Sequence, residues 1–409
     1  MRSSISSIFL LALLFHSPWA GAEPRFVQDR FCISFFVDPP IDDAAPLRYK
    51  EIAEANFNMA MGTFGAKTPQ ELRKQVKLCA KNDLACIVHS AGLPDAELPT
   101  DKHVWGYFVR DEPTMADFPA VKERVDALRA AHPGKMAYVN LFPSYCDAER
   151  LGTDSYDEHV RKFVETVQPE VLCMDHYPFM TPVKDTRDAY LADLAVMQKQ
   201  ASAAGIPWWN YFNTMPFGPH YDPTEAQLRW QIFSSVAYGA RGVLYFCYWT
   251  PRGAEFPRGG AILTAEGKKT RHYDQAKRIN ATLKAWGPHL MRMKPTWSGR
   301  FGAKGDDGGA ILSISEGDYV LGLLQHEDHR RGVVLVNHNT AYTIWPTVEF
   351  DVTDEKVNEV DRATGAIVPA IDDSPDVPGL QLSLDAGDAR LFILPEHAER
   401  AKVKAIECP

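Results

Sequence analysis

The chain has 409 residues, a length that suits two domains better than one. Hydrophobic residues make up 45% of the sequence and charged residues 24%, which is ordinary for a soluble globular protein with a large core. The formal net charge of −9 argues against nucleic acid as a partner, because nucleic-acid binding needs a basic patch.

The N-terminus has the pattern of a secretory signal. Arg2 is the only charged side chain in the first 22 residues, an apolar stretch runs from Ile8 to Phe15, and Ala20-Gly21-Ala22 fits a signal-peptidase site. The apolar stretch is too short to span a bilayer comfortably, although a membrane anchor is the alternative. We therefore expect residues 1–22 to be a signal peptide, and the mature protein to be secreted or periplasmic without a membrane attachment.

Short apolar runs alternate with longer amphipathic stretches through the first two thirds of the chain. The runs are nearly continuous in apolar residues, as parallel strands buried on both faces require. They are Phe31–Val37, Asn58–Gly62, Ala85–His89, Val104–Arg110, Met136–Phe142, Val171–Asp175, Trp208–Phe212 and Gly242–Tyr248. Helical patterns lie between them at Pro69–Asn82, Phe118–Ala131, Tyr156–Val167, Thr186–Ala204, Pro223–Tyr238 and Tyr273–Leu290.

This alternation predicts an α/β fold, a (β/α)₈ TIM barrel over residues 23–295. An open doubly wound sheet is the alternative, but no glycine-rich loop follows the first strand. From Trp297 onward the pattern changes to short strands separated by turns, at Ala310–Ser315, Tyr319–Gln325, Gly332–Asn337, Thr347–Val352, Leu380–Leu382 and Ala389–Leu394. We expect a small all-β sandwich domain over residues 296–409.

The cysteines and one histidine-rich segment have residue types that form disulfides or bind metals. Four of the seven cysteines lie inside apolar strand runs, where we expect small buried hydrophobes, and Cys408 is the best candidate for a disulfide. The segment from His326 to His329 has metal-ligand residue types, but its place between two apolar strands favours a solvated turn.

Polar and aromatic residues recur where the predicted barrel strands end, the face that carries chemistry in such barrels. Carboxylates and amides hydrogen-bond sugar hydroxyls, aromatic faces stack on sugar rings, and a carboxylic acid protonates a leaving oxygen. The sequence therefore predicts a carbohydrate substrate. The predicted substrate-binding residues are Asp38, His89, Asp111, Asn140, His176, Tyr177, Asn210, Tyr248 and Trp249, and the predicted catalytic residues are Glu112 and Asp175.

The segment Gly106-Tyr107-Phe108-Val109-Arg110-Asp111-Glu112-Pro113 resembles the strand-4 motif of clan A-like barrel glycoside hydrolases, whose Asn-Glu-Pro carries the catalytic acid. The resemblance implies that Glu112 is the acid, that Asp111 takes the hydroxyl-binding position, and that a β-domain follows the barrel. It requires neither a metal nor another cofactor. The alternative is structural, with Asp111 or Thr114 capping a helix and Glu112 supporting its dipole.

The sequence departs from this family where strand 7 ends, because Trp208–Pro216 contains no glutamate. Asp175 is the nearest rim carboxylate, and we expect it to act as general base or charge stabiliser in an inverting reaction. Four alternatives stay open. They are a hydroxyl-binding or histidine-orienting Asp175, a hexosaminidase-like reaction in which Asp111 assists an acetamido group, a non-catalytic glycan-binding protein, and a lyase or metal-dependent hydrolase on the same scaffold.

Overall fold

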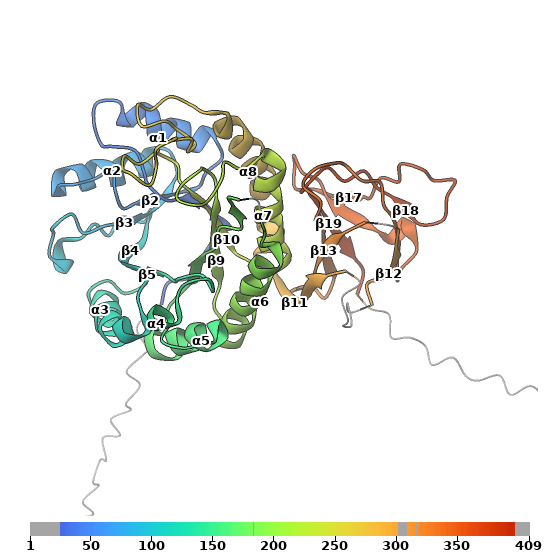
Figure 1. The fold of residues 1–409 in the computed structure, drawn as a ribbon, viewed down its shortest axis with the longest axis horizontal. Coiled ribbons are helices and arrows are strands. Elements are labelled where there is room, and N and C mark those ends of the chain that lie inside the picture. The colour runs from blue at the N-terminus through green and yellow to red at the C-terminus, as the bar shows by residue number, and fades with distance from the viewer. Residues whose placement is uncertain (1–24, 183, 302–308, 316, 397–409) are drawn as a thin grey trace, which may run out of the picture.

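The computed structural model describes residues 25–182, 184–301, 309–315 and 317–396. The predicted signal segment and Cys408 lie outside these residues. Two four-stranded parallel sheets form the first part of the molecule (Figure 1). One has the order β1 (Cys32–Phe35), β10 (Gly242–Phe246), β9 (Trp208–Asn213) and β6 (Leu172–Asp175), and the other β2 (Met59–Gly62), β3 (Ala85–Val88), β4 (Val104–Asp111) and β5 (Met136–Asn140).

The two sheets adjoin at both edges. A parallel bridge between Leu141 and Met174 joins the end of β5 to β6. On the other side, the Asn58 main-chain N–H donates to the Ile33 carbonyl at 3.1 Å, next to β1 and β2. The strands therefore fit a barrel better than a single open sheet, although the hydrogen-bond ladder is not continuous around the ring.

Helices surround the strands (Figure 1). The pattern-predicted helices appear as α2, α3, α5, α6, α7 and α8, with both ends of α3 and α5 as predicted and the other ends within two residues. Capping boxes start α2, from Thr68 and Glu71, and α7, from Thr224 and Gln227. The helices are α1 (Ala45–Glu54), α2 (Pro69–Lys81), α3 (Phe118–Ala131), α4 (Ala148–Leu151), α5 (Tyr156–Val167), α6 (Arg187–Ala204), α7 (Glu225–Ala237) and α8 (Arg271–Leu290), with single turns at Asp95–Glu97 and Met115–Asp117 and a hairpin of β7 (Phe179–Met180) and β8 (Lys184–Asp185).

Side chains fill the interior of the ring of strands. The inward cluster includes Met61, Ile87, Tyr138, Trp209 and Leu244, all buried. The interior is therefore a packed core with chemistry restricted to its ends, as in other barrels of this kind. The prediction for the four strand cysteines is confirmed, since all four are buried and free: Cys32, Cys86, Cys173 and Cys247.

The remaining strands form two antiparallel sheets. The larger has the order β11 (Met293–Arg300), β13 (Tyr319–His326), β14 (Arg331–Asn337), β19 (Ala389–Leu394), β16 (Asn358–Val360) and β17 (Ile367–Pro369). The smaller contains β12 (Ile311–Ile314), β15 (Thr347–Phe350) and β18 (Leu380–Gln381), and a single turn lies at Asp354–Lys356. Residues of both sheets share one apolar cluster, which fits the predicted sandwich. Its existence as a separate domain stays a prediction, since β11 runs through the expected boundary at 295/296.

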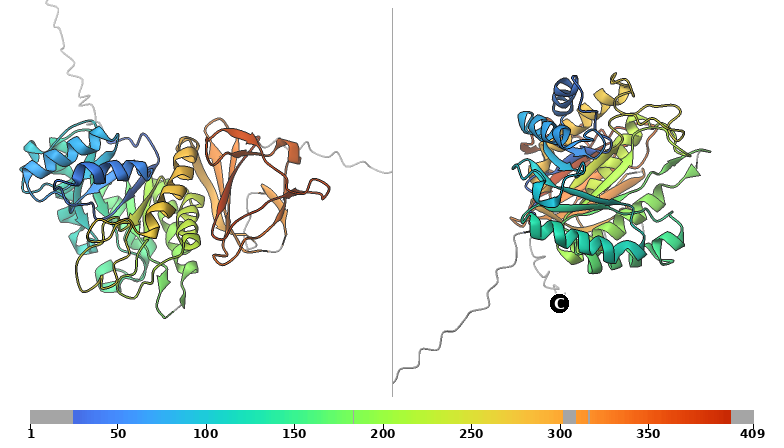
Figure 2. Two further views of the ribbon diagram at one scale, coloured as in Figure 1. Left: turned by 90° about the horizontal axis from the view of Figure 1, so that it is seen from above. Right: turned by 90° about the vertical axis from the view of Figure 1, so that its left-hand side faces the viewer.

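The second face of the larger sheet packs against the barrel helices (Figure 2). Val320, Val334 and Leu391 belong to the same apolar cluster as Trp230 and Phe233 of α7. Burial on both faces explains why the middle parts of β13 and β14, residues 320–324 and 332–336, contain no polar side chain. The turn predicted at 326–329 is present between them, with His326 buried and the next three residues exposed.

Gly322 allows this close packing, because a Cβ there would lie 2.1 Å from the Ala237 carbonyl oxygen at the end of α7. We predict that Gly322→Ala destabilises the protein by about 1–3 kcal/mol, the usual cost of overpacking. Thermal unfolding followed by circular dichroism measures the effect as a drop of a few degrees. Gly253→Ala is the control, since its nearest neighbouring atom would be 3.8 Å away. Equal unfolding temperatures for the two variants would contradict this account.

Candidate active site

A bulge in β4 decides which of its side chains face the interior. The pairing of β4 with β5 shifts between Phe108 and Arg110, so that Phe108 pairs with Tyr138 and Asp111 pairs with Asn140. Without the extra residue, strand alternation would turn Arg110 inward and Asp111 outward. The bulge therefore places the carboxyl group of Asp111, rather than the guanidinium of Arg110, inside the end of the barrel.

Glu112 follows directly, in a conformation that L-residues rarely adopt. Its φ is +47°, and its main-chain N–H donates to the Asn140 carbonyl at 2.9 Å. A left-handed conformation costs a non-glycine residue about 1–2 kcal/mol, and such strain is concentrated at functional sites. Pairing with β5 thus holds Glu112 in a strained position beside Asp111.

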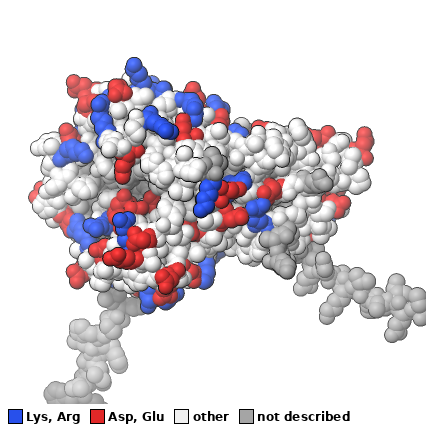
Figure 3. Space-filling model, in the orientation of Figure 1, with Lys and Arg blue, Asp and Glu red and all other residues white. Residues whose placement is uncertain are grey.

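A small pocket of about 20 Å³ lies where these strands end. This volume holds roughly one water molecule. The Asn140 amide donates to Asp111 Oδ1 at 3.1 Å, and the Tyr177 hydroxyl donates to Asp175 Oδ2 at 3.0 Å. The lining residues are Phe36, Asp111, Asn140, Asp175, Tyr177, Tyr211 and Phe246. Figure 3 shows acidic side chains beside a hollow in the barrel part of the surface.

Burial raises the pKa of all three carboxyl groups, and repulsion between charges adds to the shifts of Glu112 and Asp175. Burial, and then the charge of Asp111, raise the pKa of Glu112 to about 7, against a smaller opposing effect of Arg150. Burial and the charges of Glu112 and Asp111 raise the pKa of Asp175 well above its usual range. Burial also raises the pKa of Asp111, although part of its surface is open to solvent. Glu112 therefore titrates near neutral pH, where a general acid works best.

Several polar atoms of the pocket have no hydrogen-bond partner within the described part of the chain. They are Asp175 Oδ1, Asn140 Oδ1 and the Tyr211 hydroxyl, each shielded from solvent. An unpaired buried polar group costs about 1–3 kcal/mol, so such atoms call for an explanation. Their position beside the carboxyl cluster makes them ready contacts for the hydroxyl groups of a ligand.

Six of the nine residues expected to bind substrate do not line this pocket, and three of the six make structural contacts with polar groups. Asp38 is buried and accepts the main-chain N–H groups of Phe64 and Gly65 at 2.8 Å, and burial raises its pKa to about 6. The His176 ring meets Asp193 of α6 at 2.6 Å. Asn210 is buried and donates its amide to Tyr190 and Ser235, on the helix side of β9. The geometry gives all three structural roles.

The predicted aromatic platforms at the end of β10 are also packed away. Tyr248 is fully buried against Phe35, with ring centroids 4.5 Å apart. The Trp249 ring is covered by the Arg48 guanidinium at 4.5 Å. On β9 the expected alternation holds, with Trp209 inside the barrel and Trp208 outside. His89 does lie exposed at the mouth, 6.3 Å from the Phe108 ring.

Tyr145 joins the site although the sequence did not indicate it. It is 49% exposed on the loop after β5, and its ring packs edge-on against His176 at 4.9 Å. Burial of its hydroxyl and the charges of Asp175 and Glu112 raise its pKa, which places it near both acids. Asp193 fixes this loop, because it accepts the Ser144 N–H at 3.0 Å as well as binding His176.

Aromatic rings form one side of the pocket. Phe36 at the end of β1 stacks on Phe246 of β10 at 6.0 Å and meets Tyr211 edge-on at 5.6 Å. Phe217 extends this wall at 4.7 Å from Phe246. Tyr211 was predictable, since it alternates with the inward Trp209, whereas Phe36 and Phe246 read as ordinary strand residues. The site thus combines acids on one side with apolar faces on the other.

The comparisons with known proteins place this fold. No family model matches the sequence, and no curated protein matches it. Among solved structures, the chain resembles the β-galactosidase of Bacillus circulans sp. alkalophilus, with a TM-score of 0.55 and 9% identity over 89% of this chain and 99% of that one. It resembles a GH42 β-galactosidase of G. stearothermophilus, with a TM-score of 0.59 and 8% identity over 90% of this chain and 99% of that one.

A cold-adapted β-galactosidase of Rahnella sp. R3 is similar in the same way, with a TM-score of 0.54, 8% identity, and coverage of 90% of this chain and 98% of that one. Identities this low show the fold alone. The resemblance to barrel glycoside hydrolases is therefore confirmed at the level of the fold. Within the described residues, no helix has the length and apolar character to cross a membrane.

The raised pKa of Glu112 makes a prediction about stability. A carboxyl whose folded pKa lies above its unfolded value weakens the fold progressively as pH rises from about 4.3, the usual glutamate value, towards 7. We predict that Glu112→Gln raises the unfolding temperature at pH 8, with a smaller gain at pH 5. Glu123→Gln, at an exposed position on α3, is the matched control and should show no such pH-dependent gain. A gain for Glu112→Gln that is equal at both pH values would count against the electrostatic explanation.

Proposed function

We propose that this protein is an exported glycoside hydrolase that cleaves O-glycosidic bonds of an oligo- or polysaccharide, with Glu112 as its general acid. The observation that carries the proposal is a carboxyl with a pKa of about 7, held in a strained conformation beside two other acids at the mouth of a barrel. The shared fold of β-galactosidases supports it. Export rests on residues 1–22 of the sequence alone.

The acid step needs a proton on Glu112 and a negative charge nearby. Because the charges of Glu112 and Asp175 repel each other, ionisation of one favours protonation of the other. With the proton on Glu112, the Tyr177 hydroxyl favours the ionised form of Asp175. In the proposed reaction, Glu112 protonates the leaving oxygen while Asp175 takes a proton from the attacking water or stabilises the developing positive charge.

The other pocket atoms suit a sugar ring. The unpartnered Asn140 Oδ1 and Tyr211 hydroxyl supply hydrogen-bond partners for sugar hydroxyls. Phe36 and Phe246 supply apolar surface for the ring's carbon face, and the half-exposed Tyr145 lies near Asp175 and Glu112. The small volume of the pocket corresponds to part of one sugar unit, so we expect the rest of the substrate to lie along the open mouth.

A second candidate reaction is substrate-assisted hydrolysis of an N-acetylated sugar. The observation that favours it is Asp111, which lines the pocket next to Glu112 with its carboxylate oriented by Asn140. In that reaction Asp111 would orient the acetamido group of the substrate, whose oxygen attacks the anomeric carbon. Asp175 would then have no role as a base.

We predict that Glu112→Gln lowers the rate of hydrolysis of natural glycosides by roughly 10²–10⁴-fold, the usual contribution of general acid catalysis. Gln keeps the shape but cannot deliver a proton. Dinitrophenyl glycosides need little protonation and should lose much less. Initial rates on a panel of glycans and aryl glycosides measure both effects, with Glu123→Gln as control. Parental rates for Glu112→Gln would refute the assignment, and inactivity of the parent on the whole panel would favour the glycan-binding alternative.

The stereochemistry of the product separates the two reactions. Strands β4 and β6 are two apart, so their backbones lie roughly 9–10 Å apart, and inverting enzymes hold their carboxyls about 6.5–9.5 Å apart. We predict inversion of the anomeric centre and a strong loss of activity in Asp175→Asn. Proton NMR of the first-formed sugar identifies the anomer. Retention, restricted to N-acetylated substrates and lost in Asp111→Asn, would instead establish the substrate-assisted reaction.

A further inference from the structure

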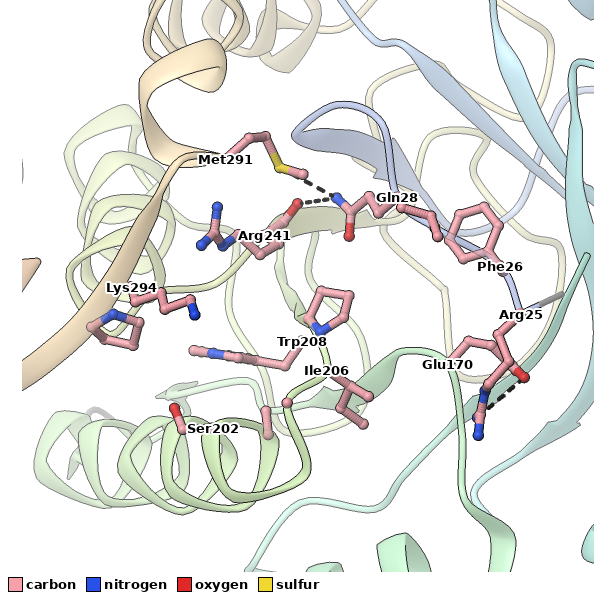
Figure 4. Close-up of a pocket in the computed structure, with 16 residues that line it drawn as sticks. Arg25, Phe26, Gln28, Glu170, Ser202, Ile206, Trp208, Arg241, Met291 and Lys294 are labelled. Atoms are coloured by element: carbon pink, nitrogen blue, oxygen red, sulfur yellow. Dashed lines mark hydrogen bonds and ion pairs between the residues drawn. The ribbon is translucent and has the colours of Figure 1, made fainter. Parts of the chain in front are cut away.

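A second and larger pocket lies at the end of the barrel opposite the carboxyl cluster. Its lining includes Glu170, Pro207 and Arg241, which lie one or two residues before β6, β9 and β10, together with the first described residues (Figure 4). Its volume is about 570 Å³. Pockets that bind small molecules usually measure roughly 300–1,000 Å³. Nothing in the proposed hydrolysis uses this pocket.

Most of the pocket surface is apolar. Phe26, Ile206, Pro207, Met291 and Pro295 supply side chains from four separate parts of the chain. These residues come from the N-terminal segment, the loop before β9, the end of α8 and β11. A ligand that fills the pocket must therefore have a largely apolar body.

Trp208 supplies an unpaired hydrogen-bond donor. Its side chain is only 3% exposed, and its indole Nε1–H has no partner among the described residues. Figure 4 shows the indole reaching across the pocket towards Lys294. Buried tryptophan N–H groups usually find an acceptor, so this one is free to bind an acceptor on a ligand.

Lys294 adds a positive charge at the same end. It lies on β11 with its side chain exposed, and in the described part of the chain no ion pair or hydrogen bond engages its ammonium group. The hydroxyl of Ser202 lies on the same wall. Three donors, one of them charged, thus converge on one end of an apolar cavity.

The other charged residues of the pocket each have a partner, although the buried Oε2 of Glu170 has none within the described part of the chain. Glu170 binds Arg25 at 3.3 Å and Arg129 at 2.6 Å. The guanidinium of Arg241 donates to the carbonyls of Leu290 and Met293. Among the described residues that line the pocket, Lys294 is therefore the charged residue that has no partner and can pair with a ligand.

Helix ends near the pocket would repel an anion if their carbonyls were free. At the end of α6, Gly205 N–H donates to the Ser202 carbonyl at 3.2 Å and Ile206 N–H to the Ala201 carbonyl at 3.1 Å. The end of α8 is paired by Arg241, as described above. Most carbonyl groups at the C-terminal ends of both helices thus accept hydrogen bonds. The donors of Trp208 and Lys294 therefore determine that the pocket prefers an anion.

We propose that this pocket binds a small apolar molecule that carries one carboxylate. The carboxylate lies between the Trp208 indole N–H and the Lys294 ammonium group, and the apolar body lies along Phe26, Ile206 and Met291. The site is independent of Glu112, which lies at the other end of the strands.

Isothermal titration of the mature full-length protein with sodium decanoate and sodium 4-phenylbutanoate at pH 7.5 tests the proposal. We expect saturable binding of at least one acid with a 1:1 stoichiometry. Methyl decanoate should bind at least tenfold more weakly. Lys294→Met, which keeps the length of the side chain, should weaken acid binding at least tenfold, and Trp208→Phe, which removes the N–H, should also weaken it.

Lys284→Met is the matched control, because Lys284 is an exposed lysine of α8 that does not line the pocket, and it should bind like the parent. Circular dichroism establishes that each variant is folded. The proposal is overturned if neither acid binds, if Lys294→Met binds both as the parent does, or if the methyl ester binds as tightly as the acid. All these measurements report binding alone, so their outcome does not depend on whether the protein hydrolyses glycosides.

Discussion

The pairing of β4 with β5 is the constraint on which the candidate active site depends. Asp111 and Asn140 are register partners, and the Asn140 carbonyl also accepts the N–H of Glu112. Strand β5 therefore fixes the positions of Asp111 and Glu112, the two adjacent acids at the end of β4. The bulge after Phe108 is what brings those acids into register with the polar end of β5, and without it the same sequence would present Arg110 to the interior.

The proximity of the acids then determines their chemistry. Glu112 and Asp175 lie at the ends of strands separated only by β5. The charge of Glu112 raises the pKa of Asp175, and the charge of Asp111 raises the pKa of Glu112, because like charges in a poorly hydrated pocket repel. Nothing in the cluster neutralises them fully, since Arg150 only reduces the effect on Glu112. The fold accepts this electrostatic cost together with the strained φ of Glu112, and the proposed acid step uses the resulting proton affinity near neutral pH.

The sequence was sufficient for the eight parallel strands, for six of the helices and for the position of Glu112, whereas α1 and the short α4 were not predicted. Buried parallel strands are nearly continuous in apolar residues, and helices carry an apolar stripe, so both leave periodic signals. Side-chain direction at the strand ends leaves a weaker signal. Asn210 and Tyr248 lie on the helix side of their strands, and Asp38 accepts hydrogen bonds from main-chain N–H groups. The sequence pattern reveals neither of these arrangements. Tyr145 reaches the site from a loop, through the contacts of Asp193, and loops carry no periodicity.

No glutamate ends the seventh barrel strand, β9, and the register of β6 and β9 shows which groups lie there instead. Asp175 of β6 pairs directly with Tyr211 of β9, so the carboxyl and the phenol are neighbours on adjacent strands. Tyr211 occupies the inward position near the end of β9. This strand therefore presents a neutral, unpartnered hydroxyl there instead of a carboxylate. In the proposed reaction, Asp175 supplies the second carboxylate from a strand nearer to β4, on a side chain one methylene shorter than the glutamate that the resemblance implies. The space between Glu112 and Asp175 would then decide whether a water molecule or a carboxylate attacks the anomeric carbon.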